Sequence, residues 1–181
     1  MRSFVGLGTN LGDRAANLRR ALAELDAVGV PPGDVSAVWE TEPVDAPSPV
    51  WFWNMAVSVE WSGAPLRLLE RLLEIEARAG RARTVRGAPR TLDLDLLLVG
   101  EQLVDEPRLA LPHPRMWARR FVLEPLAEIA PRARNPRTGR TVLEELARLY
   151  DPAVVRRIGP LATLAAVPLY SRTARGSDPA S

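Results

Sequence analysis

The segment from Leu92 to Val99 constrains the fold of this chain more than any other part of the sequence. It alternates leucine with aspartate, continues as an apolar run and is followed by Gly100, a pattern that predicts a buried β-strand. Side chains two residues apart in a strand point to the same face, so Asp93 and Asp95 would project together. The opposite face would bury the leucines at positions 92, 94, 96 and 98. We therefore expect a sheet whose surface presents two adjacent carboxylates.

Periodic apolar patterns before this strand predict two helices and three further strands. Leucines at helical spacing follow Asp13, which can cap a helix, and Pro65, which can occupy a first helical turn. The ranges 4–7, 35–41 and 54–61 are typical of strands. The resulting order is strand, helix, strand, strand, helix, strand, which is the split βαβ arrangement of ferredoxin-like folds. We therefore expect an α+β fold in which helices cover a mainly antiparallel, ferredoxin-like sheet within a single domain.

The C-terminal part of the chain predicts less regular structure. Two short helices are expected over residues 121–129 and 141–149, and the sequence beyond residue 150 ends in a stretch containing serine, glycine and proline. We expect residues 1–150 to form the functional domain. Residues 151–181 would form an extension that is partly disordered at its end.

Composition gives only a default location for the protein. An apolar fraction of 46% over 181 residues suits one compact domain. No uninterrupted apolar stretch approaches the roughly 20 residues that span a bilayer. Since the chain has no cysteine, redox chemistry does not indicate a compartment. We expect a soluble, unsecreted, cytoplasmic protein that is a monomer or weak dimer and binds neither membrane nor nucleic acid.

The chain contains no lysine, so all 24 basic side chains are arginine. This excludes enzymes that depend on a Walker A lysine, a protein-kinase lysine or a Schiff base. Residues 1–76 carry six arginines against eleven acidic residues, whereas residues 77–181 carry eighteen against eleven. Although an arginine-rich genome explains most of this bias, the concentration of positive charge after residue 77 favours an anionic ligand.

The aspartate pair and the arginines before it together indicate phosphate chemistry. Adjacent carboxylates repel each other unless they are solvated or share a cation, and Mg²⁺ bound through carboxylates and substrate phosphates is the usual arrangement. An exposed strand end is the simpler explanation of an isolated Asp-x-Asp. Guanidinium groups bind phosphate oxygens through paired hydrogen bonds. Here the aspartate pair follows a loop with four arginines, which are Arg81, Arg83, Arg86 and Arg90.

Three other features are more ambiguous. His113, the only histidine, is close in sequence to arginines, which favours a phosphate-facing donor over a transition-metal ligand. The aromatic run 51–53 before Asn54 could stack a flat heterocycle, or could belong to the core. The glycines between Gly6 and Gly12 suggest a phosphate loop, but they lack the Walker lysine and the Rossmann spacing. We interpret them as a tight strand-to-helix turn.

Taken together in order, these motifs resemble the 6-hydroxymethyl-7,8-dihydropterin pyrophosphokinase family of the folate pathway. The resemblance covers roughly residues 3–150. It rests on five motifs, which are Gly6-Leu7-Gly8-Thr9-Asn10-Leu11-Gly12, Thr41-Glu42-Pro43, Phe52-Trp53-Asn54, Gly80-Arg81 with Pro89-Arg90-Thr91-Leu92-Asp93-Leu94-Asp95, and Pro112-His113-Pro114-Arg115-Met116 with Arg119 and Phe121. Two departures stand out. Gly87 and Ala88 replace a tryptophan that helps to seal the site in some members, and Trp53 replaces an aliphatic residue.

The resemblance implies site residues as well as a fold. A ferredoxin-like core over residues 1–150 would bind MgATP and the pterin side by side. The two magnesium ions would be held by Asp93 and Asp95, and the catalytic loop arginines would be Arg81 and Arg90. The ATP-binding positions would be Glu76, Arg81, Arg83, Arg90, Leu96, Arg108, His113 and Arg119. The pterin-binding positions would be Thr41, Pro43, Val44, Phe52, Asn54, Asp93 and Phe121.

The activity implied by the family is transfer of the diphosphate of ATP to the pterin hydroxymethyl group, which gives the pterin diphosphate and AMP. Two alternatives stay open on the residues alone. A magnesium-dependent nucleotidyltransferase can also place Asp-x-Asp on a strand, but it would release pyrophosphate. An RNA-binding ferredoxin-like module is disfavoured, because the RNP1 pattern is absent and aspartates occupy a central strand.

Overall fold

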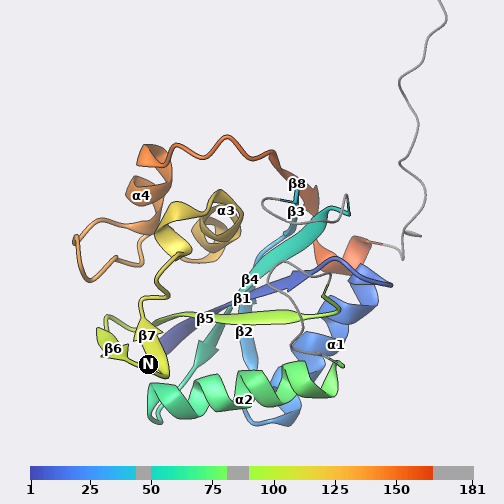
Figure 1. The fold of residues 1–181 in the computed structure, drawn as a ribbon, viewed down its shortest axis with the longest axis horizontal. Coiled ribbons are helices and arrows are strands. Elements are labelled where there is room, and N and C mark those ends of the chain that lie inside the picture. The colour runs from blue at the N-terminus through green and yellow to red at the C-terminus, as the bar shows by residue number, and fades with distance from the viewer. Residues whose placement is uncertain (44–49, 81–89, 165–181) are drawn as a thin grey trace, which may run out of the picture.

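The computed structural model describes residues 1–43, 50–80 and 90–164. These residues form a layered α/β domain in which an antiparallel sheet has helices on both faces (Figure 1). Helices α1 (Arg14–Ala27) and α2 (Pro65–Arg78) cover one face, and helices α3 (Arg120–Ile129) and α4 (Val142–Arg148) lie over the other. The two expected C-terminal helices are therefore confirmed.

The sheet has the strand order β5-β1-β4-β3-β8, and β2 also pairs with β4. All of its pairs are antiparallel. Its strands are β1 (Arg2–Thr9), β2 (Pro32–Val35), β3 (Val38–Thr41), β4 (Phe52–Glu60), β5 (Asp93–Val99) and β8 (Val155–Gly159). A separate hairpin and two 3₁₀ turns complete the described elements: β6 (Val104–Glu106), β7 (Leu109–Leu111), η1 (Met116–Ala118) and η2 (Leu161–Thr163).

Two hydrophobic cores follow from the alternation along the strands. Val5 and Leu7 of β1 belong to the core on the α1–α2 side, whereas Phe4 belongs to the core beneath α3 and α4. Helix α1 buries Leu18 and Leu25 in the first core, and its first turn is capped by Asp13, as its sequence predicts. The sheet is thus buried on both faces, except where polar side chains replace the apolar ones.

The structure corrects three local predictions. The expected strand over 35–41 is split, because the Ser36 hydroxyl accepts a hydrogen bond from Ala56 N at 2.9 Å and interrupts the regular pairing. Strand β1 continues through Gly6 and Gly8, so the turn begins only at residue 10 and contains Gly12 with φ +61°. Leu98 packs beneath α3 rather than with Leu94, because the β1–β5 register shifts nearby.

Strand β8 was not expected, because its residues lie in the range assigned to the extension. It pairs with β3 and extends the sheet at that edge. Its sequence, Val155-Arg156-Arg157-Ile158-Gly159, is short and charged, so it carries little strand signal of its own. The expected disordered end falls in 165–181, outside the described residues. No helix among the residues described is long and apolar enough to cross a membrane.

Candidate active site

Asp93 and Asp95 lie on the face of β5 that is directed towards α3. The side chains of Leu94 and Leu96 enter the opposite core, as the alternation predicts. Across the ladder, Asp93 is opposite Gly8 of β1. A Cβ added to Gly8 would lie 3.2 Å from Asn54 Oδ1 and 3.8 Å from Asp93 Cβ. The glycine therefore leaves space between the carboxylate on β5 and the amide on β4.

The carboxylate of Asp95 is in an unfavourable electrostatic environment. Burial raises the pKa of Asp95 above its ordinary value, and the neighbouring carboxylate of Asp93 raises it further. The positive charges that oppose this shift come from His113, Arg119 and Arg115. Since these charges do not cancel the shift, an added cation at the two carboxylates would be stabilised.

Arg90 and Asn10 connect the start of β5 to the end of β1. Arg90 Nη1 donates to Asp93 Oδ2 at 2.6 Å. The main chain of Arg90 is held by Asn10 at two points, because Arg90 N donates to Asn10 Oδ1 at 2.6 Å and Asn10 N donates to Arg90 O at 3.0 Å. Asn10 is fully buried. It was not among the expected site residues, although an asparagine directly after a buried strand is a recognisable signal for such a turn.

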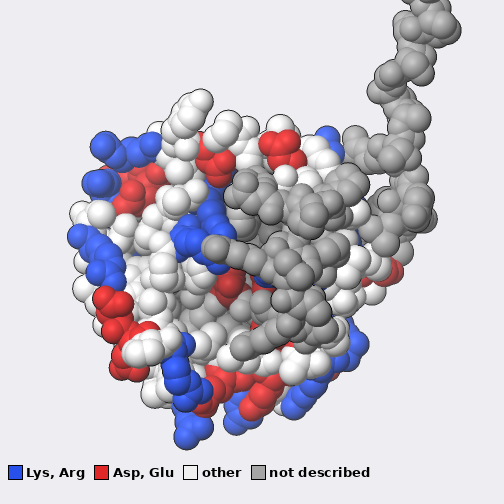
Figure 2. Space-filling view, in the orientation of Figure 1, with Lys and Arg blue, Asp and Glu red and all other residues white. Residues whose placement is uncertain are grey.

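His113 and Arg119 approach Asp95 from the segment between β7 and α3. His113 Nε2 lies 3.8 Å from Asp95 Oδ1, and its Nδ1 accepts a hydrogen bond from Arg115 N at 3.3 Å. Burial lowers the pKa of His113; Asp95 opposes this shift, and Arg119 adds to it. Acidic and basic side chains lie next to one another near the middle of this face of the molecule (Figure 2). Because Nδ1 of His113 accepts a hydrogen bond from Arg115 N, Nε2 is the ring nitrogen placed to donate.

Thr41, Asn54 and Phe52 lie at the neighbouring ends of β3 and β4. Asn54 Nδ2 donates to Thr41 Oγ1 at 2.8 Å, and both residues are buried. Phe52 is half-buried, as is Phe121 in the first turn of α3. The aromatic run before Asn54 is divided between two roles, because Trp53 points into the core on the α1–α2 side. Only Phe52 of this run and Asn54 remain candidates for stacking and edge recognition.

Comparison with known proteins identifies the family. Residues 4–131 match the model of the 7,8-dihydro-6-hydroxymethylpterin-pyrophosphokinase (HPPK) family. The chain belongs to this family. The predicted resemblance is therefore confirmed, and it extends over most of the expected 1–150 domain.

Two relatives show the extent of the similarity to whole HPPK proteins. The 2-amino-4-hydroxy-6-hydroxymethyldihydropteridine pyrophosphokinase of Bacillus subtilis is 41% identical over 149 residues, which are 82% of this chain and 89% of that protein. The protein of the same name from Methylorubrum extorquens is 42% identical over 158 residues, which are 87% and 98% of the two chains. The similarity therefore includes nearly the full length of both relatives.

The fold is also similar to solved structures. Plasmodium falciparum HPPK-DHPS in complex with pteroate superposes with a TM-score of 0.61 at 13% identity, over 81% of this chain. This chain spans only 44% of that protein. At this identity the likeness concerns the fold alone.

Within this HPPK chain, three expected nucleotide contacts lie away from the carboxylate face. Glu76 is buried on the α1–α2 side, where its Oε1 accepts from Leu94 N at 2.8 Å and satisfies a backbone donor at the edge of the sheet. The Leu96 side chain is buried in the same core, so Leu96 could meet a nucleotide only through its main chain. Arg108 is exposed and pairs with Glu70 of α2 at 3.3 Å.

Three further expected site residues of this HPPK chain, Arg81, Arg83 and Val44, lie outside the described residues, as does Arg86 of the arginine loop. Pro43 is half-buried and is the last residue described before that gap. The structure therefore brings together Asp93, Asp95, Arg90, His113 and Arg119, with Thr41, Asn54 and Phe52 beside them.

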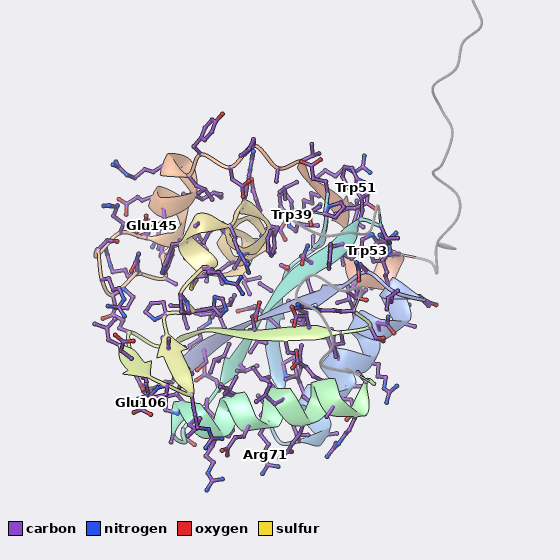
Figure 3. The ribbon with its side chains drawn as sticks, viewed as in Figure 1. Trp39, Trp51, Trp53, Arg71, Glu106 and Glu145 are labelled. Atoms are coloured by element: carbon purple, nitrogen blue, oxygen red, sulfur yellow. The ribbon has the colours of Figure 1, made fainter. Side chains whose placement is uncertain are left out.

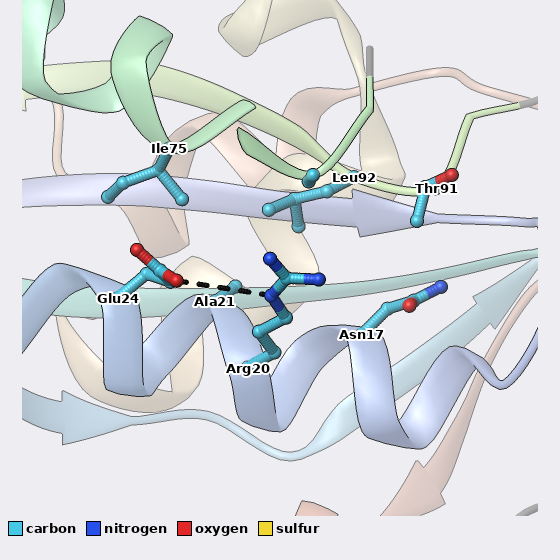
Figure 4. Close-up of a pocket in the computed structure, with 8 residues that line it drawn as sticks. Asn17, Arg20, Ala21, Glu24, Ile75, Thr91 and Leu92 are labelled. Carbon is cyan, nitrogen blue, oxygen red and sulfur yellow. Dashed lines mark ion pairs between the residues drawn. The ribbon is translucent and has the colours of Figure 1, made fainter. Parts of the chain in front are cut away.

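A pocket on the other face of the HPPK sheet is distinct from this site. It lies between α1, the end of α2 and the start of β5 (Figure 4). Its charged lining residues, Arg20 and Glu24, pair with each other at 3.9 Å, and Leu92 closes it on the core side. Because its charges are already paired within the chain, the carboxylate face is the better candidate for an anionic substrate.

Proposed function

We propose that this HPPK family member transfers the terminal diphosphate of ATP to the hydroxymethyl oxygen of 6-hydroxymethyl-7,8-dihydropterin, with AMP as the leaving group, in folate biosynthesis. The observation that carries the proposal is the adjacency of two sets of groups on one face of the sheet. Asp93 and Asp95 suit a metal-bound polyphosphate. The hydrogen-bonded pair Thr41 and Asn54 suits the edge of a heterocycle.

Asp93 and Asp95 would hold Mg²⁺, and two ions are proposed. The donor set fits this metal, because carboxylate oxygens are its preferred protein ligands. Burial and the charge of Asp93 raise the pKa of Asp95, so an added cation would favour its ionised form. Among the described residues no group of three or more acidic, histidine or cysteine side chains could hold a metal. Substrate phosphates would therefore complete the coordination. When bound, the ions would lower the pKa of the attacking hydroxyl and neutralise phosphate charge.

The nucleotide phosphates would be held by Arg90, His113 and Arg119. The guanidinium of Arg90 is already 2.6 Å from Asp93, so it can bridge the carboxylate and a phosphate oxygen. His113 would donate its Nε2 proton, because its Nδ1 already accepts a hydrogen bond from the main chain. Arg81 and Arg83 are proposed to add positive charge from the loop that precedes Arg90, as the family resemblance implies.

The pterin would bind between Phe52 and Phe121, with its polar edge on Thr41, Asn54 and Asp93. Flat heterocycles stack on aromatic side chains, while amide and hydroxyl groups orient them. Asp93 would then face both substrates. This agrees with its position, because Arg90 lies on one side of it and the space that Gly8 leaves beside Asn54 lies on the other. Pro43 and Val44 are proposed to contribute from the segment after β3.

The sheet also supports the proposal of a ferredoxin-like core. If β2 and β3 are counted as one strand, the strands numbered along the chain lie across the sheet in the order fourth, first, third and second. Antiparallel pairing throughout and helices in both crossovers agree with this arrangement.

One incubation tests the reaction. The protein is supplied with MgATP and 6-hydroxymethyl-7,8-dihydropterin, and the nucleotide product is identified by chromatography. AMP together with a pterin diphosphate is expected. Free pyrophosphate with an adenylylated pterin would instead indicate a nucleotidyltransferase, and the diphosphate-transfer proposal would be abandoned.

A further inference from the structure

A second charged cluster lies on the α1–α2 side of the sheet, behind the strands that carry the proposed pterin contacts. We call it the Glu40 cluster. It consists of Glu40 on β3, Arg14 at the start of α1, Arg156 on β8, and the rings of Trp51 and Trp53. Its members therefore come from four separate parts of the chain.

Glu40 is the centre of this cluster and is only 6% exposed. Arg156 donates to Glu40 Oε2 from Nε at 3.0 Å and also from Nη2. On the other carboxylate oxygen, Arg14 Nη1 lies at 3.4 Å and the indole Nε1 of Trp53 at 3.3 Å. Both oxygens of one buried carboxylate are thus occupied by groups from α1, β4 and β8.

The two arginines also contact the tryptophan rings. Arg14 lies over the Trp53 ring at 4.4 Å, and Arg156 lies over the Trp51 ring at 4.9 Å. Arg14 Nη1 in addition donates to the main-chain oxygen of Trp51 at 2.9 Å. Trp51 and Trp53 lie at the same end of the sheet, close to β8 (Figure 3). The cluster therefore fixes the main chain just before β4 as well as the strands.

Strand register links this cluster to the proposed pterin subsite. Glu40 pairs with Trp53 and with Arg156, and the next residue, Thr41, pairs with Phe52. Because successive side chains alternate, Thr41 and Phe52 project from the same short backbone segment to the opposite face. Any displacement of Glu40 would consequently move the residues proposed to hold the pterin.

We propose that Glu40 and Arg156 are positioning residues for the pterin subsite, so that strand β8 supports pterin binding and not nucleotide binding. This inference rests on the proposed function for the identity of the ligand. Arg90 precedes β5, Asp95 lies on β5 and His113 lies in the segment leading to α3, so none of them is on the strands that the cluster fixes.

The test compares Arg156→Met with Arg157→Met in the full chain. Methionine removes the charge and the hydrogen-bonding guanidinium of Arg156 but keeps an unbranched side chain. Arg157 is its neighbour on β8, pairs with Glu128 at 2.6 Å and is more exposed, so it is a matched control. Arg156→Met is expected to raise the KM for the pterin about tenfold, while kcat and the KM for ATP change less than about twofold. Arg157→Met should leave all three values near wild type.

Direct binding separates this inference from the proposed reaction. Calorimetric titration of the pterin into protein with a non-hydrolysable ATP analogue should show the same roughly tenfold weakening in Arg156→Met. An unchanged pterin Kd, or an equal loss for the nucleotide analogue, would overturn the positioning role. Pterin binding by a wild-type protein that releases no AMP would instead overturn the proposed reaction alone.

A double-mutant cycle with Glu40→Gln provides a second readout. Glu40 and Arg156 would act as one unit. The pterin Kd of the double variant should therefore be at most about twofold higher than that of whichever single variant binds the pterin less tightly. Additive losses would contradict a shared role. Circular dichroism and thermal unfolding of each variant check that the fold is retained.

Discussion

The two faces of the sheet place carboxylates in opposite electrostatic environments. In the Glu40 cluster, one buried carboxylate lies between two guanidinium groups. Burial alone would raise the pKa of Glu40, but hydrogen bonding and charge from Arg156, with Trp53 and Arg14, lower it below its ordinary value. On the other face Asp95 adjoins Asp93, and burial together with this neighbouring charge raises the pKa of Asp95. The carboxylate of Glu40 lies between two cations and stabilises the fold, whereas two adjacent carboxylates, one of them with a raised pKa, are suited to an external cation.

The largest effect expected from this contrast concerns turnover. Asp95→Ala should lower the rate of AMP formation at least about a thousandfold, because a magnesium ligand is lost. The thermal midpoint should hardly change, because removing Asp95 also removes repulsion with Asp93. Product chromatography and thermal unfolding measure the two quantities. Asp105→Ala, at an exposed position on β6, is the control, and near-normal turnover in Asp95→Ala would refute the metal assignment.

Glu40→Ala should show the reverse pattern, with a large loss of stability. Removing one partner from a buried ion pair leaves uncompensated charge, and a loss of about 3 kcal/mol in the free energy of unfolding is expected. Urea denaturation measures it. Glu74→Ala, which removes an exposed pair with Arg71, should change stability little. Equal stability of Glu40→Ala and Glu74→Ala would contradict a stabilising role of the buried Glu40 carboxylate.

Gly8→Ala tests whether the space between Asp93 and Asn54 is needed. The added Cβ would lie 3.2 Å from Asn54 Oδ1, so the amide must shift. The KM for the pterin is expected to rise about tenfold with little change in thermal midpoint. Gly6→Ala is the comparison, because its Cβ would meet only the flexible end of Leu97 at 3.5 Å. A larger effect at Gly6 than at Gly8 would argue against this use of the space.

The smallest expected effect is a pH dependence of opposite sign at the two carboxylates. The folded-state pKa of Glu40 lies below 4.5, so its contribution to stability is present above 4.5 and is lost as the pH falls through the folded pKa. The folded-state pKa of Asp95 lies above 3.8, so its contribution is present below 3.8 and is lost as the pH rises through the folded pKa.

Unfolding of Glu40→Gln and Asp95→Asn in EDTA, across this acidic range, measures the effect. Relative to wild type, Glu40→Gln should lose its disadvantage as the pH falls, whereas Asp95→Asn should gain stability as the pH rises. Parallel pH profiles for the two variants would show that the carboxylates are not in contrasting environments.

Local pattern was sufficient for several parts of the fold and for the carboxylate face. The alternation in 92–96 predicted which leucines are buried and that Asp93 and Asp95 share a face. The cap at Asp13 and the helices after residue 120 were also predicted, because each depends on neighbours within a few residues. The split at Ser36 was missed, because it depends on a side-chain hydrogen bond to another strand.

The sequence by itself determined the family, the order of the elements up to β5 apart from the split at Ser36, and the shared face of Asp93 and Asp95, because these depend on short motifs and on spacing along the chain. Only the tertiary structure decided that β8 joins the sheet and that Arg156 meets Glu40, which is 116 residues away. The burial of Glu76 beneath β5 was decided in the same way. The pairing of an edge strand and the charge that a buried carboxylate meets depend on distant backbone positions, and no local pattern specifies them.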